Sequence, residues 1–183
     1  MQYASLVVAI CGLVLACLSL GWQAANFVLT GGRVKVEFRV GATGGRAMLT
    51  AEPNSFNPDW LTELAQQGYR QPIAAVRVAN VGRQPVTVER WGFQHPAAGT
   101  LFPVADFIGK PLPHRLEVGQ SETWAMDLGP VVDLLKVGNE IVAKRPVRRT
   151  LFAQAVASAG SPGIVAVVEL ADGRAKRGRG TLR

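Results

Sequence analysis

The stretch that decides the fold of this chain is Arg33-Val34-Lys35-Val36-Glu37-Phe38-Arg39-Val40. Apolar side chains occupy every even position of this stretch, and charged side chains occupy every odd one. Successive side chains of a β-strand point to opposite faces, so the alternation predicts a strand with one face in a core and the other in water. The stretch also divides the chain, because no charged side chain precedes Arg33.

The segment before this strand is long, apolar and uncharged. Tyr3 and Trp22 flank its most apolar part and lie 19 residues apart, which is about 28 Å along a helix. The hydrocarbon core of a bilayer is about 30 Å thick, so both rings would fall at the level of the headgroups. We therefore expect a transmembrane anchor helix over residues 1–29, a hinge over residues 30–32 and a β domain over residues 33–183.

A cleaved signal peptide is the competing interpretation of this segment. Signal peptides begin with a basic region, and Met1–Ser5 contains neither lysine nor arginine. Ala24 and Ala25 are small residues of the kind found at cleavage sites, which keeps the alternative open. We favour an anchor that stays attached.

The basic side chains that follow the segment predict its orientation. Arg33, Lys35, Arg39 and Arg46 come within a short distance of its end, and nothing basic precedes it. By the positive-inside rule, the N-terminus then lies outside the cell membrane and the domain lies in the cytoplasm.

Small and polar residues form a stripe along the predicted anchor helix, at alternating steps of four and three. This stripe, called the seam below, consists of Ser5, Ala9, Gly12, Ala16, Ser19, Gln23 and Asn26. Small residues let two helix backbones approach closely, and amides can hydrogen-bond across the pair. The seam predicts self-association or docking on a partner helix. The alternative is that small residues, which are common in membrane helices, fall into register by chance.

The rest of the chain has the pattern of short strands separated by turns. Strands are expected at 33–40, 46–50, 73–80, 86–94, 116–118, 123–128, 163–170 and 176–182, and helices at 59–67 and from 130 onward. Gly138-Asn139 is expected to end the second helix. Residues 95–113 contain four prolines and are expected to form an irregular connection. Both His95 and His114 are expected in loops.

Residues 73–80 and 86–94 are expected to pair with each other as a hairpin. Along the second of these strands, the apolar residues change from one face to the other between Val88 and Trp91. A β-bulge near Glu89-Arg90 would return all of them to the core, because a bulge inserts one extra residue into a strand.

These expectations together indicate a mainly β fold. It consists of an N-terminal transmembrane helix followed by an antiparallel, immunoglobulin-like β-sandwich with two short helices in its connections. Both cysteines, Cys11 and Cys17, lie in the apolar segment, so a disulfide scaffold and the cysteine-bridged antibody domain are excluded. A hydrophobic content of 48% and a charged content of 18% exclude an intrinsically disordered chain.

Two parts of the domain carry a resemblance to known proteins. The first is Val76-Arg77-Val78-Ala79-Asn80-Val81-Gly82-Arg83-Gln84-Pro85-Val86-Thr87-Val88 with Trp91-Gly92-Phe93, and the second is Leu112-Pro113 with Leu116-Glu117-Val118-Gly119-Gln120-Ser121 and Trp124. With the anchor and the alternating strand before them, these stretches resemble a group of uncharacterised bacterial single-pass membrane proteins with one small immunoglobulin-like β-sandwich domain. The resemblance covers about two-thirds of the chain. It implies a fold and no catalytic residue, because its motifs are turn and core residues.

The net charge of +7 lies entirely in the last 40 residues. Residues 1–143 contain 11 basic and 11 acidic side chains, whereas residues 144–183 contain nine basic and two acidic ones. The residues expected to form one basic patch are Lys144, Arg145, Arg148, Arg149, Arg174, Lys176, Arg177 and Arg179. The simplest interpretation is a solvated edge; the alternatives are contact with anionic lipid, an acidic protein or nucleic acid. Nucleic acid is disfavoured, because no binding motif accompanies these residues and no aromatic residues are interleaved with them.

No pattern of residues in the sequence is typical of catalysis, of a metal site or of a cofactor site. His95 and His114 do not have the spacing of metal ligands. Gly119-Gln120-Ser121-Glu122 lacks the final glycine of a nucleophile elbow. We therefore expect no enzyme activity, no cofactor and no metal.

The sequence thus predicts a membrane-anchored, non-enzymatic binding or scaffold protein. Its expected contact surfaces are the proline-rich connection around Phe102–Lys110 and the basic residues near the C-terminus. Two alternatives stay open. One is an electrostatic binder of anionic lipid or nucleic acid that works through residues 144–183. The other is an accessory subunit of a larger membrane complex that docks through the seam.

Overall fold

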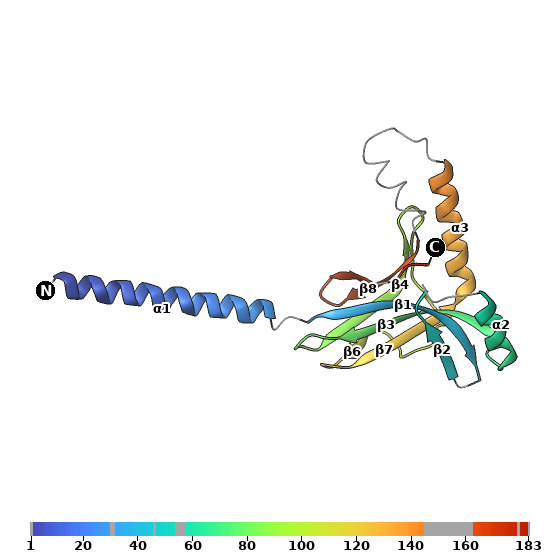
Figure 1. Ribbon diagram of the computed structural model, residues 1–183, viewed down its shortest axis with the longest axis horizontal. Helices are drawn as coiled ribbons and strands as arrows, with labels where there is room; N and C mark the ends of the chain where they lie inside the picture. Colours follow the sequence, from blue (N-terminus) through green and yellow to red (C-terminus); the bar gives the residue numbers. More distant parts are fainter. Residues whose placement is uncertain are drawn as a thin grey trace.

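A computed structural model of the chain describes residues 2–29, 32–45, 47–53, 58–144, 163–178 and 180–182. Within these residues, the chain forms a long N-terminal helix and a domain of two antiparallel sheets with two further helices (Figure 1). The expectation of a mainly β fold that follows an apolar helix is confirmed.

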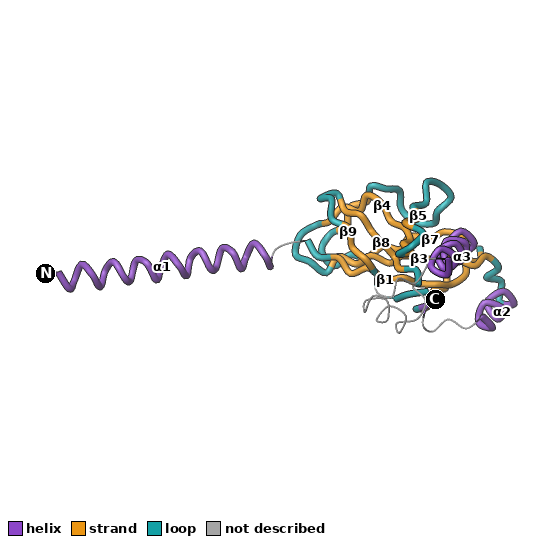
Figure 2. Tube along the Cα trace, turned by 90° about the horizontal axis from the view of Figure 1, so that it is seen from above, coloured by secondary structure: helices purple, strands orange, loops and turns teal. Residues whose placement is uncertain are grey.

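Helix α1 (Gln2–Leu29) extends away from the sheets in both views (Figures 1 and 2). It contains no charged side chain, and none of its span Val7–Asn26 is buried. Among the described residues, this is the one helix long and apolar enough to cross a membrane. A signal sequence near an N-terminus meets the same criteria of length and hydropathy.

The first sheet has the strand order β2-β1-β3-β7, and all its pairings are antiparallel. Its strands are β1 (Val34–Gly44), β2 (Ala47–Ala51), β3 (Gln71–Asn80) and β7 (Ser121–Asp127). The alternating stretch forms β1 as predicted, with Val36, Phe38 and Val40 buried. The strand continues beyond the predicted end because β2 pairs with its second half. A glycine is needed there, since a Cβ on Gly41 would lie 1.8 Å from the carbonyl oxygen of Leu49.

The second sheet has the strand order β5-β4-β8-β9, with β6 also paired to β4. Its strands are β4 (Val86–His95), β5 (Gly99–Leu101), β6 (His114–Leu116), β8 (Val165–Leu170) and β9 (Ala175–Arg177). The predicted bulge is confirmed, because the register between β4 and β8 shifts between Val88 and Arg90. All four apolar residues of β4 are buried as a result: Val86, Val88, Trp91 and Phe93.

The expected hairpin between residues 73–80 and 86–94 is wrong. β3 lies in the first sheet and β4 in the second, so the connection between them crosses from one sheet to the other. Asn80 holds this crossing in place and is almost fully buried. Its Nδ2 donates to the carbonyl oxygens of Gln84 at 2.8 Å and Leu116 at 3.1 Å, and its Oδ1 accepts from the N–H of Gly82 at 3.0 Å.

One hydrophobic core lies between the two sheets and contains residues from both. Phe38 of β1 contacts Phe93 of β4 with ring centroids 5.1 Å apart, and Trp91 meets Phe93 edge-on at 5.9 Å. Aromatic pairs of this kind contribute about 0.5–1.5 kcal/mol each beyond the area they bury. The two sheets therefore form a sandwich-like unit that holds the loops at its ends in defined positions.

Two helices lie in the connections of the domain, as predicted. Helix α2 (Pro58–Gln66) buries Leu64 and half-buries Trp60 and Leu61. Helix α3 (Leu128–Lys144) is longer than expected, because it does not end at Gly138-Asn139. Gly138 is buried in the interior of the helix, where it packs against the ring of His95. This glycine therefore serves close packing and is not a helix stop.

The expected positions of three other residues are also corrected. His95 is the last residue of β4 and is fully buried, and His114 is the first residue of β6. The N–H groups of Ala97 and Ala98 donate to Nδ1 of His95 at 3.2 and 3.3 Å, which stabilises the buried imidazole. Val118 lies in the turn after β6 and is 54% exposed, so the predicted strand over 116–118 ends before it.

Candidate functional site

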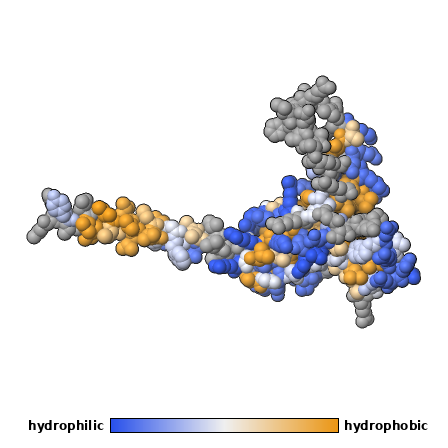
Figure 3. All heavy atoms as spheres, in the orientation of Figure 1, coloured by the Kyte–Doolittle hydropathy of each residue, from blue (hydrophilic) through white to orange (hydrophobic). Residues whose placement is uncertain are grey.

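The most extensive apolar surface of the described chain is on α1. Figure 3 shows apolar residues gathered along the middle of this helix, whereas the adjacent end of the domain shows hydrophilic residues with a few apolar ones among them. Val8, Leu15 and Leu20 are 72%, 67% and 66% exposed. Side chains of this kind are stable in lipid or against another apolar surface, and water is the least favourable environment for them.

The seam residues with described side chains all lie exposed on α1: Ala9, Gly12, Ala16, Ser19, Gln23 and Asn26. The Nε2 of Gln23 donates to Oγ of Ser19, one turn earlier, at 3.5 Å. Apart from Gly12, its two chain neighbours and the nearby backbone of the same helix, no described atom lies within 4 Å of the position that a Cβ on Gly12 would take. The side chain of Ser5 lies outside the described residues. This face of the helix therefore has room for a second helix at close range.

Three residues of the expected basic patch lie together on the hairpin between β8 and β9. Arg174, Lys176 and Arg177 are exposed there. Arg174 is neutralised locally, because its Nε donates to Oδ2 of Asp172 at 2.7 Å. This contact holds the pKa of the Asp172 carboxyl below its ordinary value. Lys176 and Arg177 make no ion pair within the described ranges, so they carry the positive charge of this edge.

The other residues of the expected patch are not joined to this hairpin by the described structure. Lys144 is the last residue of α3, and its Nζ pairs with Glu140 at 3.6 Å. Figure 2 shows α3 apart from β9. Arg145, Arg148, Arg149 and Arg179 lie outside the described residues. Within the described residues, the β8–β9 hairpin is therefore the part of the expected basic patch in which basic side chains lie together.

The proline-rich connection is fastened to the sheets at both ends. The guanidinium of Arg90 lies over the ring of Phe102, 5.2 Å from its centroid. Further along, the carbonyl oxygen of Lys110 accepts from Nε1 of Trp124 at 2.8 Å. Between these contacts Val104 is 96% exposed. The connection thus presents an apolar tip on a defined frame, as a binding loop does.

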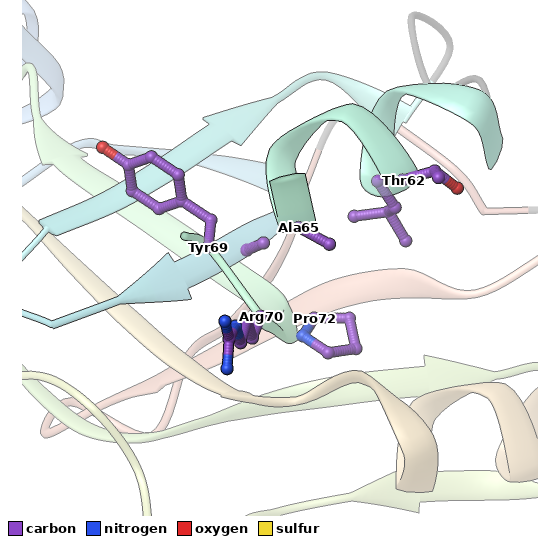
Figure 4. Close-up of a pocket in the computed structure, with 7 residues that line it drawn as sticks. Thr62, Ala65, Tyr69, Arg70 and Pro72 are labelled. Carbon is purple, nitrogen blue, oxygen red and sulfur yellow. The ribbon is translucent and has the colours of Figure 1, made fainter. Parts of the chain in front are cut away.

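A shallow cavity of about 280 Å³ lies beside α2 (Figure 4). It is lined by Ala42, Leu61, Thr62, Ala65, Tyr69, Arg70 and Pro72. Arg70 is the one charged side chain in this lining, so the cavity contains no carboxylate or histidine for acid–base chemistry. Its size and composition are those of a surface groove.

A second cavity, of about 340 Å³, lies at the end of the domain nearest α1. Its lining includes Gly32, Gln84, Thr87, Asp172 and Arg174. Its two charged residues are the ion pair described above. Within this lining, the Asp172 carboxylate accepts hydrogen bonds from the N–H and Nε of Arg174.

The described domain shows no cluster of side chains suited to hold a metal ion. Over the described ranges, no group of three or more histidine, cysteine, aspartate or glutamate side chains could hold a metal ion. The ring of His114 packs edge-on against Trp124, with centroids 6.0 Å apart. The two histidines therefore have packing roles in the described domain.

Comparison of the chain with protein-family models, with curated proteins and with solved structures finds no match.

Proposed function

We propose that the chain is a single-pass membrane protein in which α1 remains attached as the anchor. In this proposal, the two-sheet domain is an immunoglobulin-like, non-enzymatic binding or scaffold module at the membrane surface. The domain belongs with the uncharacterised bacterial single-pass proteins that its turn and core residues resemble. Its partner is a protein, or a second copy of the chain that associates through the seam.

The exposure of every residue in the α1 span Val7–Asn26 is the observation that supports this proposal best. The core helix of a soluble protein is mostly buried, whereas no residue of the span Val7–Asn26 is buried. Its strongly apolar residues contribute about −0.3 to −0.6 kcal/mol each on transfer to the centre of a bilayer. Lipid is therefore the environment that stabilises this helix.

Attachment to the membrane would help the domain to bind its partners. An anchor confines the domain to a thin layer beside the lipid, which raises its effective concentration toward other proteins of the same membrane. The connection around Val104 and the β8–β9 hairpin are exposed surfaces on a rigid frame, and each is suited to contact a partner.

Extraction of the full chain from membranes tests the anchor. The expected result is that the protein stays in the membrane fraction after alkaline carbonate washing and that its mature N-terminus is Met1. A mature chain that begins near Asn26 and is found in the soluble fraction would overturn the proposal in favour of a signal peptide.

The orientation of the domain is part of the proposal, with the N-terminus outside and the domain in the cytoplasm. The basic residues Arg33, Lys35 and Arg39 after α1 support it. For the test, Cys11 and Cys17 are replaced by alanine and a single cysteine is introduced at exposed Gln66. A membrane-impermeant thiol reagent should label this cysteine only after the cells are opened. Labelling of this cysteine in intact cells would show that the domain lies outside, opposite to the proposed orientation.

Electrostatic binding through residues 144–183 is a second candidate function. The exposed and unpaired cations Lys176 and Arg177 favour it within the described structure. The test is binding of the chain, held in neutral vesicles, to anionic vesicles and to an oligonucleotide. Binding should fall steeply between low and physiological salt, and should be lost when Arg174, Lys176, Arg177 and Arg179 are changed to glutamine. Binding that the quadruple variant retains would reject this candidate.

A role as an accessory subunit of a larger membrane complex is the third candidate, and the exposed seam supports it as it supports self-association. Capture of the intact protein in mild detergent, followed by identification of the co-purifying chains, distinguishes it from self-association. A partner that is lost on filling the seam would support docking through α1.

A further inference from the structure

We propose that the end of the domain nearest α1 docks on the anionic headgroups of the bilayer that holds α1. The inference rests on the proposed membrane anchorage and deepens it, because it names the lipid surface as a ligand of the domain. The docking surface consists of Arg33, Val81, Arg83 and Val118 and is called the proximal face below. It borders the basic β8–β9 hairpin, whose Asp172 and Arg174 line a cavity together with Gly32 and Gln84.

Hydrogen bonds between backbone groups hold the proximal face together. The carbonyl oxygen of Arg33 accepts from the N–H of Val81 at 2.8 Å and of Gly82 at 3.0 Å. The N–H of Asn80 donates to the carbonyl oxygen of Gln120 at 2.9 Å, and the N–H of Gly119 donates to that of Asn80 at 3.0 Å. The start of β1, the β3–β4 crossing and the β6–β7 turn therefore lie side by side, facing α1 (Figure 1).

Two valines project from this surface. Val81 is 61% exposed and Val118 is 54% exposed, although both are apolar and lie in turns, where polar residues prevail. The turn that bears Val118 is fixed by Gly119, which has a φ of 77°, and by the N–H of Gln120 donating to the carbonyl oxygen of Glu117 at 3.0 Å. The two side chains are thus presented outward by rigid turns.

The charge around these valines is complementary to anionic lipid. Arg33 and Arg83 are exposed and make no ion pair in the part of the chain that the structure describes. The two carboxylates of neighbouring turns are neutralised, since Glu117 pairs with Arg115 at 2.8 Å and Asp172 pairs with Arg174. The proximal face therefore has a net positive charge, which the negative surface potential of anionic lipid attracts.

The short connection to α1 places this face at the lipid surface. A bilayer core that covers Val7–Asn26 leaves Leu29 about 5 Å beyond it, within the headgroup layer. Gly32 follows three residues later, at most about 11 Å away even with an extended chain. An arginine at this distance has its charge within about one Debye length of the headgroups.

Quenching by lipid measures the contact in the full chain. Cys11 and Cys17 are changed to alanine, Val118 is changed to cysteine and labelled with a fluorophore, and the protein is reconstituted in vesicles. The vesicles are phosphatidylcholine with or without one quarter phosphatidylglycerol, and both contain a lipid with a nitroxide on its headgroup. The matched control has its label at exposed Gln66 on α2 instead.

Docking predicts that the Val118→Cys label is quenched at least twofold more strongly than the Gln66→Cys label, and more strongly in the anionic vesicles. Changing Arg33 and Arg83 to glutamine should weaken docking by about fivefold for each arginine. The difference in quenching between the Val118→Cys and Gln66→Cys labels in anionic vesicles should then fall to its value in neutral vesicles. An unchanged melting temperature of this variant shows that the domain remains folded.

The outcomes separate the two proposals. A protein that does not float with the vesicles overturns both the anchor and the docking. A protein that floats with the vesicles, but whose two labels are quenched equally, retains the anchor and overturns the docking. Equal quenching of the Val118→Cys label in neutral and anionic vesicles also overturns it, because the arginines would then play no part.

Discussion

Gly138 of α3 lies directly against the ring of His95, so close that a Cβ on Gly138 would come within 2.1 Å of His95 Nδ1. The ring belongs to the last residue of β4 and is fully buried, so it has no free space to move into. This contact joins the middle of the long helix to the end of the second sheet.

Gly138→Ala should therefore destabilise the domain, although alanine is the better helix former. The gain in helix propensity of about 1 kcal/mol is outweighed by the strain of overpacking, for a net loss of about 1–2 kcal/mol. Urea unfolding of the full chain in detergent measures this change. Val137→Ala, at an exposed position of the same helix, is the control and should change stability by less than about 0.5 kcal/mol. A Gly138→Ala protein as stable as the original would show that the contact can relax.

Asn80→Ala should destabilise the connection that crosses between the sheets. The substitution leaves the carbonyl oxygen of Leu116 and the N–H of Gly82 without their buried partner. An unsatisfied buried group costs about 1–3 kcal/mol, so a loss of about 2–4 kcal/mol is expected in an unfolding experiment. Gln84→Ala serves as the control, because it keeps the backbone carbonyl oxygen of residue 84 that accepts from Nδ2 of Asn80. Equal stabilities of the two variants would contradict a role for the Asn80 amide.

Glu37 should make the stability of the domain depend on pH. Its pKa is lowered chiefly by the hydrogen bond from Lys35, at 2.7 Å, and further by Arg39, at 3.0 Å, while burial opposes the shift. A carboxyl whose pKa is lower in the folded state stabilises it above the ordinary pKa of about 4.3. This stabilisation is lost as the pH falls through the folded-state pKa.

The measurement for Glu37 is the difference in unfolding free energy between the original chain and Glu37→Gln, followed from pH 7 to pH 3. We expect the original chain to be more stable at pH 7 and the difference to narrow below about pH 4.3. A difference that stays constant over this range would show that Glu37 titrates alike in the folded and unfolded chains.

Filling the seam should reduce association of α1. Changing Gly12 and Ala16 to leucine removes the close approach of two backbones, so resonance energy transfer between labelled chains in vesicles should fall several-fold. Val7→Leu with Val14→Leu adds volume on the opposite face of the helix and is the matched control. Association that survives the first pair of changes but not the second would assign the contact to the other face.

The local features of the fold could be predicted from the sequence because they depend on neighbouring residues. The alternation over 33–40 specifies which face of β1 is buried, and the change of parity between Val88 and Trp91 required the bulge that the structure shows. The span of α2 is equally local, since its start and end are determined by short-range signals.

Features that depend on distant contacts could not be predicted in this way. The turn after Asn80 has the composition of a hairpin turn, and only the partner at Leu116 makes it a crossing between sheets. Gly138 has the usual signature of a helix end, but its neighbour in space is His95, 43 positions earlier in the chain. The seam could be predicted from the sequence because its residues share one face of a single helix. The basic patch could not, because it depends on contacts between residues that are far apart in the sequence.

The pairing of β1 has a mechanical consequence. The chain enters the domain through this strand, which lies inside the first sheet and is joined to β3 by ten residue pairs from Val34–Asn80 to Thr43–Gln71. Under the proposed anchoring, tension between α1 and a bound partner would act along the axis of β1. A force parallel to the strands loads all ten β1–β3 pairs at once in shear. A force perpendicular to the strands would instead break the pairs one after another. The point of attachment is thus suited to transmit force without unravelling the domain.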